Sequence, residues 1–546
     1  MELTLRVDGV AVEVTDDGSS LLDILRNHLG VRTPKDGCSP QGQCGCCTVL
    51  VDGQPRVACV TPARRVAGRD IVTLAGLPSS VRDRWAEAFT ATGASQCGFC
   101  TPGIIVRLAA TNGGEAVGRP EAARALLAHL CRCTGWQTIV EAAATLPPPA
   151  PGRDVAAAAR RATLEGGSRQ QVGPQVALGG AGFADDSAPP DALVAVPDGE
   201  GGWAVGSSLA EARTAAGKVS GRRSGVALRH PLSVPPGDWD ATLQTTWVEP
   251  GYVETDASWC RPGGEPVTPL GNGGAFGGKV ASPAPAAARA LADRYGRPVR
   301  VLLSREDTVR LGPKRPPVAG GARADGTGVI RVARTPGVAA AIASVAPGLR
   351  VEEVDVAGPP TSAALRGAGW MEAAVLLAGA GAGAGDLRGS GGSGGSGGSE
   401  SSGSGGHGAS VGGPVTVVSP GGGRATARVE VGPDGRPVAV TVHVAAGDPL
   451  DEVVLRSYAV GAAHMALSWV CSEGIAVDGD GRPQDLTVRS FGILRAVDTP
   501  PIEVVIEPGS GPPVNGSDAV MAAVAAATWI AQGRPPAWPT MRGHFS

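Results

Sequence analysis

Nine of the 11 cysteines in the chain lie between residues 38 and 133, where they form two groups of five and four. Each group must bring several sulfur atoms to one place, which restricts the fold more than any other feature. In a reducing compartment, grouped thiols indicate metal before disulfide. The two groups therefore predict two metal centres near the N-terminus, and Cys260 and Cys471 stand apart from both.

The first group consists of Cys38, Cys44, Cys46 and Cys47 in one glycine-rich loop, followed by Cys59. A [2Fe–2S] cluster needs four thiolates, and Cys44-x2-Cys47 matches part of the plant-type spacing C-x4-C-x2-C. The interval from Cys38 to Cys44 is one residue longer than in that pattern. We expect Cys38, Cys44, Cys47 and Cys59 to be the ligands. Cys46 is then surplus, or it replaces Cys47 if the loop is shifted in register.

The second group consists of Cys97, Cys100, Cys131 and Cys133. The first pair leads into one predicted helix and the second pair ends another, so neighbouring helix ends can gather four sulfurs. A structural zinc site or a disulfide pair is the alternative, although C-x-C is a poor spacing for tetrahedral zinc. We expect these four cysteines to hold a second cluster.

Composition excludes several classes of protein. The chain has 48 basic and 51 acidic residues, so no broad field favours nucleic acid. Its apolar stretches are broken well before the roughly 18 residues that a membrane span needs, and the first residues alternate apolar and polar instead of forming a leader. We therefore expect a cytoplasmic protein without a membrane span. With 546 residues it should contain several domains.

Residue patterns divide the chain. Alternating Leu3, Leu5 and Val7 before Asp8-Gly9 predict a hairpin, and Ser20-x-x-Asp23 predicts a helix start. We expect a β-rich unit over 1–76, a four-helix unit over 77–146, a linker over 147–175, an α+β region over 176–388, a flexible Gly/Ser tether over 389–406 and a second α+β part over 407–546. The tether reads as either a natural insertion or an added linker.

Within the four-helix unit, Thr101-Pro102 predicts an N-cap followed by proline in the first turn. Two further helices are expected over 121–130 and 137–144, before the proline-rich run that ends the unit. The seven histidines show no metal-ligand spacing, and we expect them to be structural.

The cysteine motifs resemble the iron–sulfur part of the xanthine oxidase family of molybdenum hydroxylases. The resemblance rests on residues 37–49, on Gln96–Gly103 and on Cys131–Gly135, and it covers residues 1–146. It implies a β-grasp, plant-ferredoxin-like [2Fe–2S] domain followed by an all-α, four-helix [2Fe–2S] domain. It also implies that Gln96 and Cys133 lie against the pterin of a molybdenum cofactor.

The rest of the chain is similar, in fragments, to the molybdopterin-binding region of that family. Gly273–Lys279 looks like its glycine-rich cofactor loop, which implies cofactor contacts for Gly274, Ala275, Phe276 and Gly277. Arg366, with Glu372 downstream, resembles the substrate-side arginine loop of carbon monoxide dehydrogenase-like members. Taken alone, these residues would be an ordinary glycine-rich loop and a surface arginine.

One departure concerns the residue that takes a proton during hydroxylation. The family has a glutamate there, in a G-x-G-E-P element, whereas this chain has Gly516-Ser517-Asp518. Ser517 cannot serve as that base, so Asp518, displaced by one residue, is the candidate catalytic residue. The alternative is that Asp518 is the N-cap of a helix predicted over 519–530.

The resemblance implies an oxidoreductase of the xanthine dehydrogenase and aldehyde oxidase type. It would hydroxylate a small aldehyde or N-heterocycle and pass electrons through the second and then the first [2Fe–2S] cluster. No flavin domain is visible between residues 147 and 175, so the acceptor would be a separate FAD-binding subunit or another electron acceptor. The alternative is a non-catalytic electron-transfer or scaffold subunit with a degenerate molybdenum site. Oligomerisation is left open.

Overall fold

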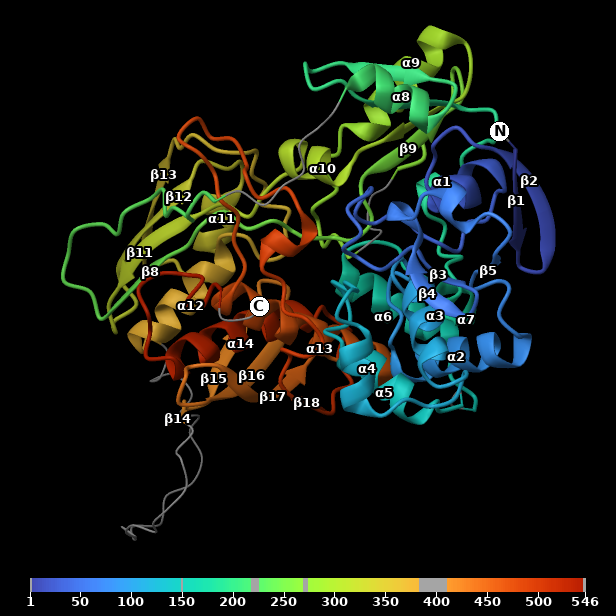
Figure 1. The fold of residues 1–546 in the computed structure, drawn as a ribbon. Helices are drawn as coiled ribbons and strands as arrows, with labels where there is room; N and C mark the ends of the chain where they lie inside the picture. Colours follow the sequence, from blue (N-terminus) through green and yellow to red (C-terminus); the bar gives the residue numbers. More distant parts are fainter. Residues whose placement is uncertain (1, 149–150, 218–224, 269–273, 383–409, 544–546) are drawn as a thin grey trace.

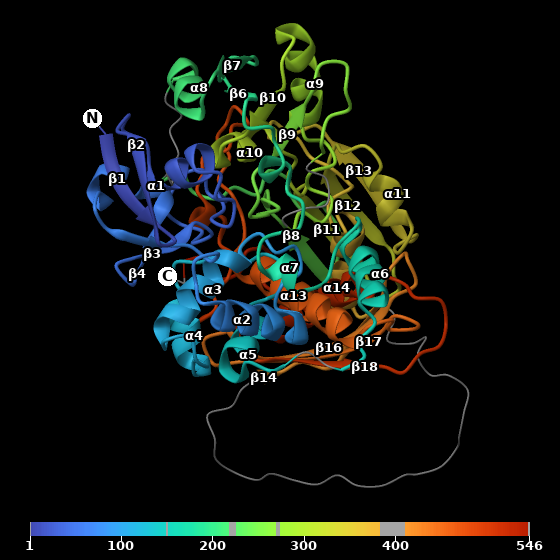
Figure 2. The same ribbon diagram turned by 90° about the vertical axis from the view of Figure 1, so that its right-hand side faces the viewer.

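The computed structural model describes residues 2–148, 151–217, 225–268, 274–382 and 410–543. The expected tether at 389–406 lies outside these residues. Figures 1 and 2 show the N-terminal domains along one side of the molecule, with the sheets of the later region stacked beside them.

The N-terminal domain is a five-stranded sheet with the strand order β2-β1-β5-β3-β4. The predicted hairpin is confirmed, with Leu3, Leu5 and Val7 buried on one face. The predicted helix start is also confirmed, because the Asp23 backbone N–H donates to Ser20 Oγ at 3.2 Å. The elements are β1 (Glu2–Val7), β2 (Val10–Thr15), α1 (Leu21–Asp23), a π-helical turn η1 (Ile24–His28), β3 (Thr48–Val51), β4 (Gln54–Val57) and β5 (Asp70–Val72).

The second domain contains the four expected helices, α2 (Ser79–Thr92), α3 (Thr101–Thr111), α4 (Arg119–Ala125) and α5 (Gln137–Thr145). The predicted cap is wrong by one residue, because Cys100 is the N-cap and Thr101 is already helical. The helix expected over 121–130 is shorter than predicted, because α4 ends at Ala125. The chain then turns toward the first cysteine loop. Leu130 N donates to Cys44 O there at 3.0 Å.

The prediction that residues 147–175 form a linker is wrong, because they contain helix α6 (Val155–Gly166). Arg161 and Glu165 gave this stretch a polar appearance, yet both side chains are fully buried and form an ion pair at 3.0 Å. Arg161 also donates to Pro449 O and Val514 O. A charged helix can therefore be part of the core when buried acceptors satisfy its charges.

Three more sheets follow. The first, β7-β6-β10-β9, has helices α8 and α9 at the top of Figures 1 and 2. Its elements, with the short α7 before them, are α7 (Pro174–Ala177), β6 (Leu193–Pro197), β7 (Trp203–Gly206), α8 (Leu209–Ala216), β9 (Ala257–Cys260), α9 (Ala284–Tyr295) and β10 (Val299–Leu302).

The second of these sheets has the strand order β13-β12-β11-β8. It comprises β8 (Ala241–Gln244), β11 (Val318–Ala322), β12 (Gly328–Ala333) and β13 (Leu349–Val354). Helices α10 (Arg305–Leu311), α11 (Val338–Ala343) and α12 (Trp370–Ala380) are nearby in the chain.

The last sheet lies at the bottom of both views and is covered by two apolar helices. Its elements are β14 (Ser410–Val411), β15 (Val415–Val418), β16 (Arg424–Val431), β17 (Pro437–Ala445), α13 (Glu452–Cys471), β18 (Ile502–Ile506) and α14 (Ser517–Ala531). Helices α12, α13 and α14 share one hydrophobic core with this sheet and with the sheet β13-β12-β11-β8. The parts before and after residues 389–406 therefore fold as one unit.

Helix α13 is long and apolar enough to cross a membrane by length and composition alone. In the structure, 89% of its apolar window is buried against the rest of the chain. Such burial is typical of the central helix of a protein core.

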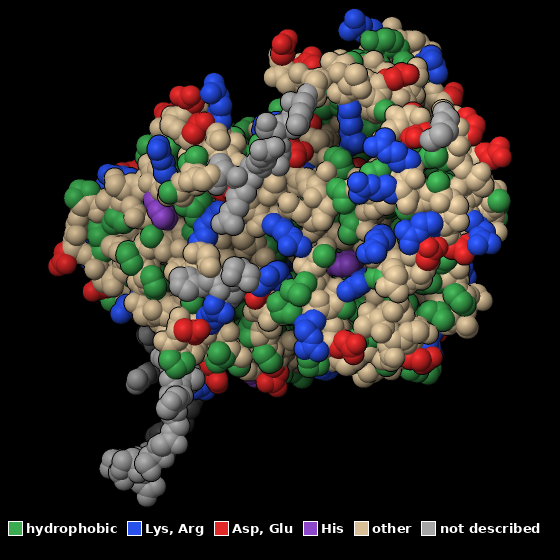
Figure 3. Space-filling model, in the orientation of Figure 1, with side chains coloured by type: hydrophobic (Ala, Val, Ile, Leu, Met, Phe, Trp, Pro, Cys, Tyr) green, Lys and Arg blue, Asp and Glu red, His purple; other side chains and the backbone are tan. Residues whose placement is uncertain are grey.

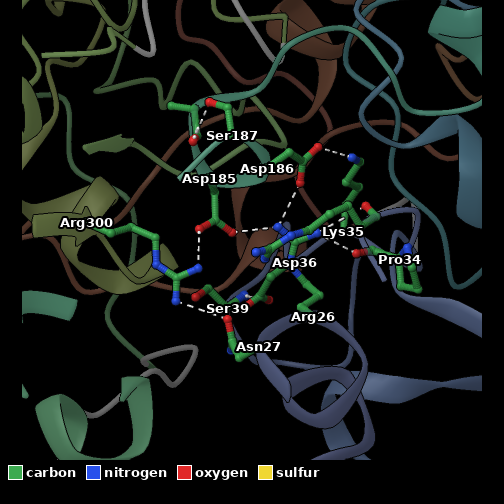
Figure 4. A network of polar contacts seen from close by, with 12 residues as sticks. Arg26, Asn27, Pro34, Lys35, Asp36, Ser39, Asp185, Asp186, Ser187 and Arg300 are labelled. Atoms are coloured by element: carbon green, nitrogen blue, oxygen red, sulfur yellow. Dashed lines mark hydrogen bonds and ion pairs between the residues drawn. The ribbon is translucent and has the colours of Figure 1, made fainter. Parts of the chain in front are cut away.

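A buried charge network joins the N-terminal domain to the sheet above it (Figure 4). Arg26 of η1 contacts Asp185 at 2.7 Å and Asp186 at 2.8 Å, and Lys35 also pairs with Asp186. Arg300 of β10 reaches Asp185 at 3.1 Å. Burial alone would raise the pKa of Asp185, but Arg300 and Arg26 hold it well below its usual range. The network fixes the docking of three segments that are far apart in the sequence.

Helix α3 and the first cysteine loop are in backbone contact. A Cβ atom placed on Gly103 would lie 2.3 Å from Gly45 O and 2.9 Å from the Cys46 carbonyl carbon. No side chain fits between these segments, so glycine sets how closely the two domains approach.

We expect Gly103→Ala to destabilise the protein by about 1–3 kcal/mol, because the added methyl overpacks this contact. Chemical denaturation, together with iron content, measures the effect. Gly413→Ala is the matched control, since a Cβ there meets nothing within 4 Å. Equal stability of the two variants would contradict the close packing.

Candidate functional site

The first cysteine set is buried where the loop before β3 meets the turn after β4. Two of its sulfurs accept hydrogen bonds from backbone N–H groups. Gln41 N donates to Cys38 Sγ at 3.2 Å, and Cys59 N donates to Cys47 Sγ at 3.4 Å. Thiol hydrogen bonds from Cys44 and Cys59 lower the pKa of Cys38 and raise the pKa of the two donors. The structure thus brings the four expected ligands together.

The second set is buried where α3 begins and where the loop after α4 leads toward α5. Cys133 Sγ lies 3.6 Å from Cys97 Sγ. Thiol hydrogen bonds from Cys100 and Cys133 lower the pKa of Cys131 and raise the pKa of both donors. Among the described residues, no three His, Cys, Asp or Glu side chains are arranged to hold a single metal ion. A [2Fe–2S] cluster instead takes its four thiolates from around two irons.

Cys46 lies where the first cysteine loop meets helix α3. Its thiol is buried and contacts Cys44 O at 3.7 Å, and its carbonyl accepts from Lys35 N at 3.1 Å. The same carbonyl group is close to Gly103 of α3. Burial raises the pKa of the Cys46 thiol.

Gln96, Cys133 and Gly274, expected on the cofactor side, lie together. Gln96 Nε2 donates to Cys133 O at 3.1 Å and to Ser457 Oγ of α13 at 3.0 Å. Its Oε1 is buried and has no hydrogen-bond partner among the described residues. A Cβ on Gly274, whose φ is +73°, would lie 2.6 Å from Cys133 Sγ. Glycine therefore lets this loop approach the second cysteine set.

The glycine loop and the arginine loop are also adjacent. Arg366 N donates to Phe276 O at 3.0 Å, and the Arg366 guanidinium lies 4.4 Å from the centre of the Phe276 ring. A Cβ on Gly277 would lie 1.8 Å from Ala364 O, so this position also requires glycine. Arg366 is buried, which rules out an ordinary surface arginine.

Asp518 contacts the same arginine. Arg366 Nε donates to Asp518 Oδ1 at 2.7 Å, and Arg366 Nη2 donates to Ser517 Oγ. The N-cap alternative for Asp518 is wrong, because α14 begins at Ser517 and its N-cap is Gly516. Glu165 of α6 instead accepts from Gly516 N at 3.1 Å and from Ser517 N at 2.9 Å. That carboxylate satisfies the helix start, and Asp518 is left to pair with Arg366.

A cavity of about 40 Å³ lies beside Ala275, Phe276 and Arg366. Three charged residues that line it are held by buried ion pairs. Arg132 contacts Glu473 at 2.6 and 2.7 Å, and Arg315 contacts Glu372, behind the wall, at 2.6 and 3.0 Å. A further lining carboxylate, Glu249, pairs with Lys314 at 2.9 Å.

Sequence reasoning missed Glu473 and Glu165. The position of Arg132 between two cysteines of the second set indicated that it would be buried, and a buried charge needs a partner of opposite charge. That partner is 341 residues away, at the end of α13, and nothing local identifies it. Glu165 gave no signal, because a glutamate in a polar stretch looks solvated.

Comparison with known proteins agrees with this arrangement. A 2Fe-2S iron-sulfur cluster binding domain matches residues 4–69, and a [2Fe-2S] binding domain matches residues 73–144. The small subunit of nicotine 6-hydroxylase from Paenarthrobacter nicotinovorans is 40% identical over 151 residues, which are 27% of this chain and 90% of that subunit. The chain belongs to the xanthine oxidase family of molybdenum hydroxylases.

Xanthine dehydrogenase from Blastobotrys adeninivorans is 37% identical over 166 residues, which are 28% of this chain but 12% of that relative. The solved structure of aldehyde oxidoreductase from Desulfovibrio gigas has a TM-score of 0.67 at 16% identity, over 96% of this chain and 97% of that one. This likeness extends the family fold beyond residue 146. The expected multidomain fold class is confirmed.

We expect Cys46→Ala to keep full iron content and Cys47→Ala to lose iron from the first set, because Cys47 accepts a backbone N–H as a cluster ligand does. Iron analysis and visible absorption of the purified variants measure this. Loss of iron in Cys46→Ala with retention in Cys47→Ala would assign the ligand to the other thiol.

Proposed function

We propose that this chain is an iron–sulfur and molybdopterin oxidoreductase subunit of the xanthine dehydrogenase and aldehyde oxidase type. It hydroxylates a small aldehyde or N-heterocycle and passes the electrons to a separate FAD-binding subunit or another acceptor. The observation that supports this most is the placement of two complete four-cysteine sets on either side of one backbone contact, with the glycine loop against the second set.

The residues beside the second set fit a molybdenum cofactor. Gln96 Oε1 is a buried acceptor that an amino group of a pterin would satisfy. Gly274 to Gly277 give close backbone access, and the buried Arg366, paired with Asp518, lies beside them. When bound, the cofactor would supply two-electron oxidation, and each [2Fe–2S] cluster would carry one electron.

The neighbouring cavity supports a small substrate. Its volume of about 40 Å³ holds roughly three water-sized groups. Met465, Met521 and Trp469 give it apolar walls, and the Arg132–Glu473 and Arg315–Glu372 pairs hold the polar side in place. An uncharged planar molecule with one polar atom suits such walls.

Asp518 is the proposed proton acceptor. It is the carboxylate nearest in sequence to the family's glutamate position, and its ion pair with Arg366 holds it beside the two cofactor-side loops. The same ion pair favours the second candidate function, a non-catalytic electron-transfer or scaffold subunit. One oxygen of Asp518 is already bonded to Arg366, and Ser517 cannot act as a base.

Metal and pterin analysis of the purified full-length protein tests the proposal. We expect four irons per chain, bound molybdopterin and two distinct electron paramagnetic resonance signals after reduction, since the two sets have different hydrogen bonding. A single iron centre, or zinc in the assay, would contradict the electron-transfer function under either candidate.

We expect Asp518→Asn to lower turnover of aldehydes or N-heterocycles with an artificial acceptor by about 100-fold or more, because Asn cannot accept the proton. Iron content should be unchanged. Asp480→Asn, in an exposed loop, is the control. Unaltered turnover in Asp518→Asn would exclude Asp518 as the base. Absence of turnover in the unmodified protein with molybdenum bound would leave the electron-transfer role.

A further inference from the structure

A buried arginine without an ion-pair partner lies beside the first cysteine set. Arg305 is the first residue of α10, and a capping box between Ser304 and Asp307 fixes the start of that helix. Arg305 is 1% exposed. Its Nε and Nη1 are buried without a hydrogen-bond partner, and none of the ion pairs among the described residues involves it. A buried charge of this kind is costly unless an opposite charge lies near it.

Arg305 is held against the loop that carries the first set. Its Nη2 donates to Gly37 O at 2.7 Å and to Val253 O at 2.7 Å, and both contacts are buried. Gly37 directly precedes Cys38, and a Cβ placed on Gly37 would lie 3.1 Å from Cys44 Sγ. Gly37 therefore links the guanidinium group to two of the expected cluster ligands.

The two charged residues just before Gly37 are already paired. Lys35 pairs with Asp186 (Figure 4), and Asp36 Oδ2 lies 3.8 Å from a guanidinium nitrogen of Arg213. Figure 3 shows many other Lys and Arg side chains at the surface, where solvent and salt screen their charge. Arg305 differs from both groups, because its charge is buried and unpaired.

The arginine at the second set is neutralised. Arg132 lies between Cys131 and Cys133, and its two Nη atoms donate to the Glu473 carboxylate at 2.6 and 2.7 Å. Both side chains are buried, so the pair adds little net charge beside the second set. The two sets therefore differ, with a paired arginine at the second and an unpaired arginine at the first.

We propose that Arg305 is the electrostatic partner of the first [2Fe–2S] cluster and raises its reduction potential. The inference rests on the proposed function, which requires a cluster there. Four thiolates and two sulfides outweigh two ferric ions, so the oxidised cluster is an anion that suits the buried guanidinium group. One electron from the second cluster adds a further negative charge, which the same cation favours. Net charge and hydrogen bonding around a cluster are among the factors that set its potential.

Glu306 carries the opposing charge on the same helix. Its Oε1 accepts from Gln41 Nε2 at 2.6 Å, and Gln41 N donates to Cys38 Sγ at 3.2 Å. The contact between Glu306 and Gln41 is only partly buried, so solvent weakens the effect of this carboxylate on the cluster. Removing the Glu306 charge should therefore raise the potential, and by less than removing the Arg305 charge lowers it.

Redox titration of the full-length protein, followed by electron paramagnetic resonance, measures the potential of each cluster separately. In Arg305→Gln we expect the equilibrium constant for reduction of the first cluster to fall about tenfold, which corresponds to about 59 mV for one electron. Arg305→Lys keeps the charge and should retain most of the potential, and Glu306→Gln should raise it. The second cluster is the internal reference. Arg65→Gln, at an exposed arginine of the first domain, is the matched control and should shift neither potential.

An unchanged first-cluster potential in Arg305→Gln, with iron content intact, would overturn the electrostatic role, as would an equal fall in Arg305→Lys. Loss of the first cluster from Arg305→Gln alone would support that role, because Gln still offers an N–H donor to Gly37 O but no charge. Loss from both variants would make Arg305 a purely structural residue of the loop. Absence of clusters from the unmodified protein would refute the proposed function and this inference with it, whereas intact clusters with unshifted potentials refute this inference alone.

Discussion

The backbone contact between α3 and the first cysteine loop is the constraint on which the rest of the structure depends. Gly103 meets Gly45 O and the Cys46 carbonyl with no room for a side chain. Each cysteine set is built within its own domain, so this contact, together with the hydrogen bond from Leu130 N to Cys44 O at 3.0 Å, sets the spacing between the two sets. Electron transfer between centres depends steeply on their separation, and a rigid backbone contact holds that separation better than flexible side chains do.

Buried ion pairs fix the later region onto this iron–sulfur unit. Arg132, between two cysteines of the second set, is paired with Glu473 at the end of α13. Arg26 and Arg300 meet at Asp185 beside the first set. Such pairs gain little net stability, because desolvation offsets attraction, but removing one partner is costly. They therefore define one relative placement of the domains and penalise others.

Local patterns were enough to predict the cysteine sets, the hairpin and the four helices, because spacing, turns and caps act within a few residues. The resemblance also pointed to the glycine loop and to Arg366, and the structure brings the two into contact. Helix α6 was missed because Arg161 and Glu165 look solvated. Arg161 donates to Pro449 O, 288 residues away, and Glu165 accepts from Ser517 N, 352 residues away. The N-cap reading of Asp518 failed because α14 begins one residue earlier, at Ser517. Asn515 accepts from Asp518 N at 3.0 Å, and Glu165 from a distant helix accepts from Ser517 N at 2.9 Å. Long-range partners of charged groups have no local signal.

The start of α14 shows how packing and chemistry are linked in this chain. Glu165 is held by Arg161 and accepts two backbone N–H groups at the helix N-terminus, where negative charge is favoured. A glutamate at position 517 would add a second negative charge beside it in a buried site, which is unfavourable. Serine keeps position 517 neutral beside Glu165, and its hydroxyl accepts from Arg366 Nη2. The carboxylate at this helix start belongs to the next residue, Asp518, which forms an ion pair with the same arginine.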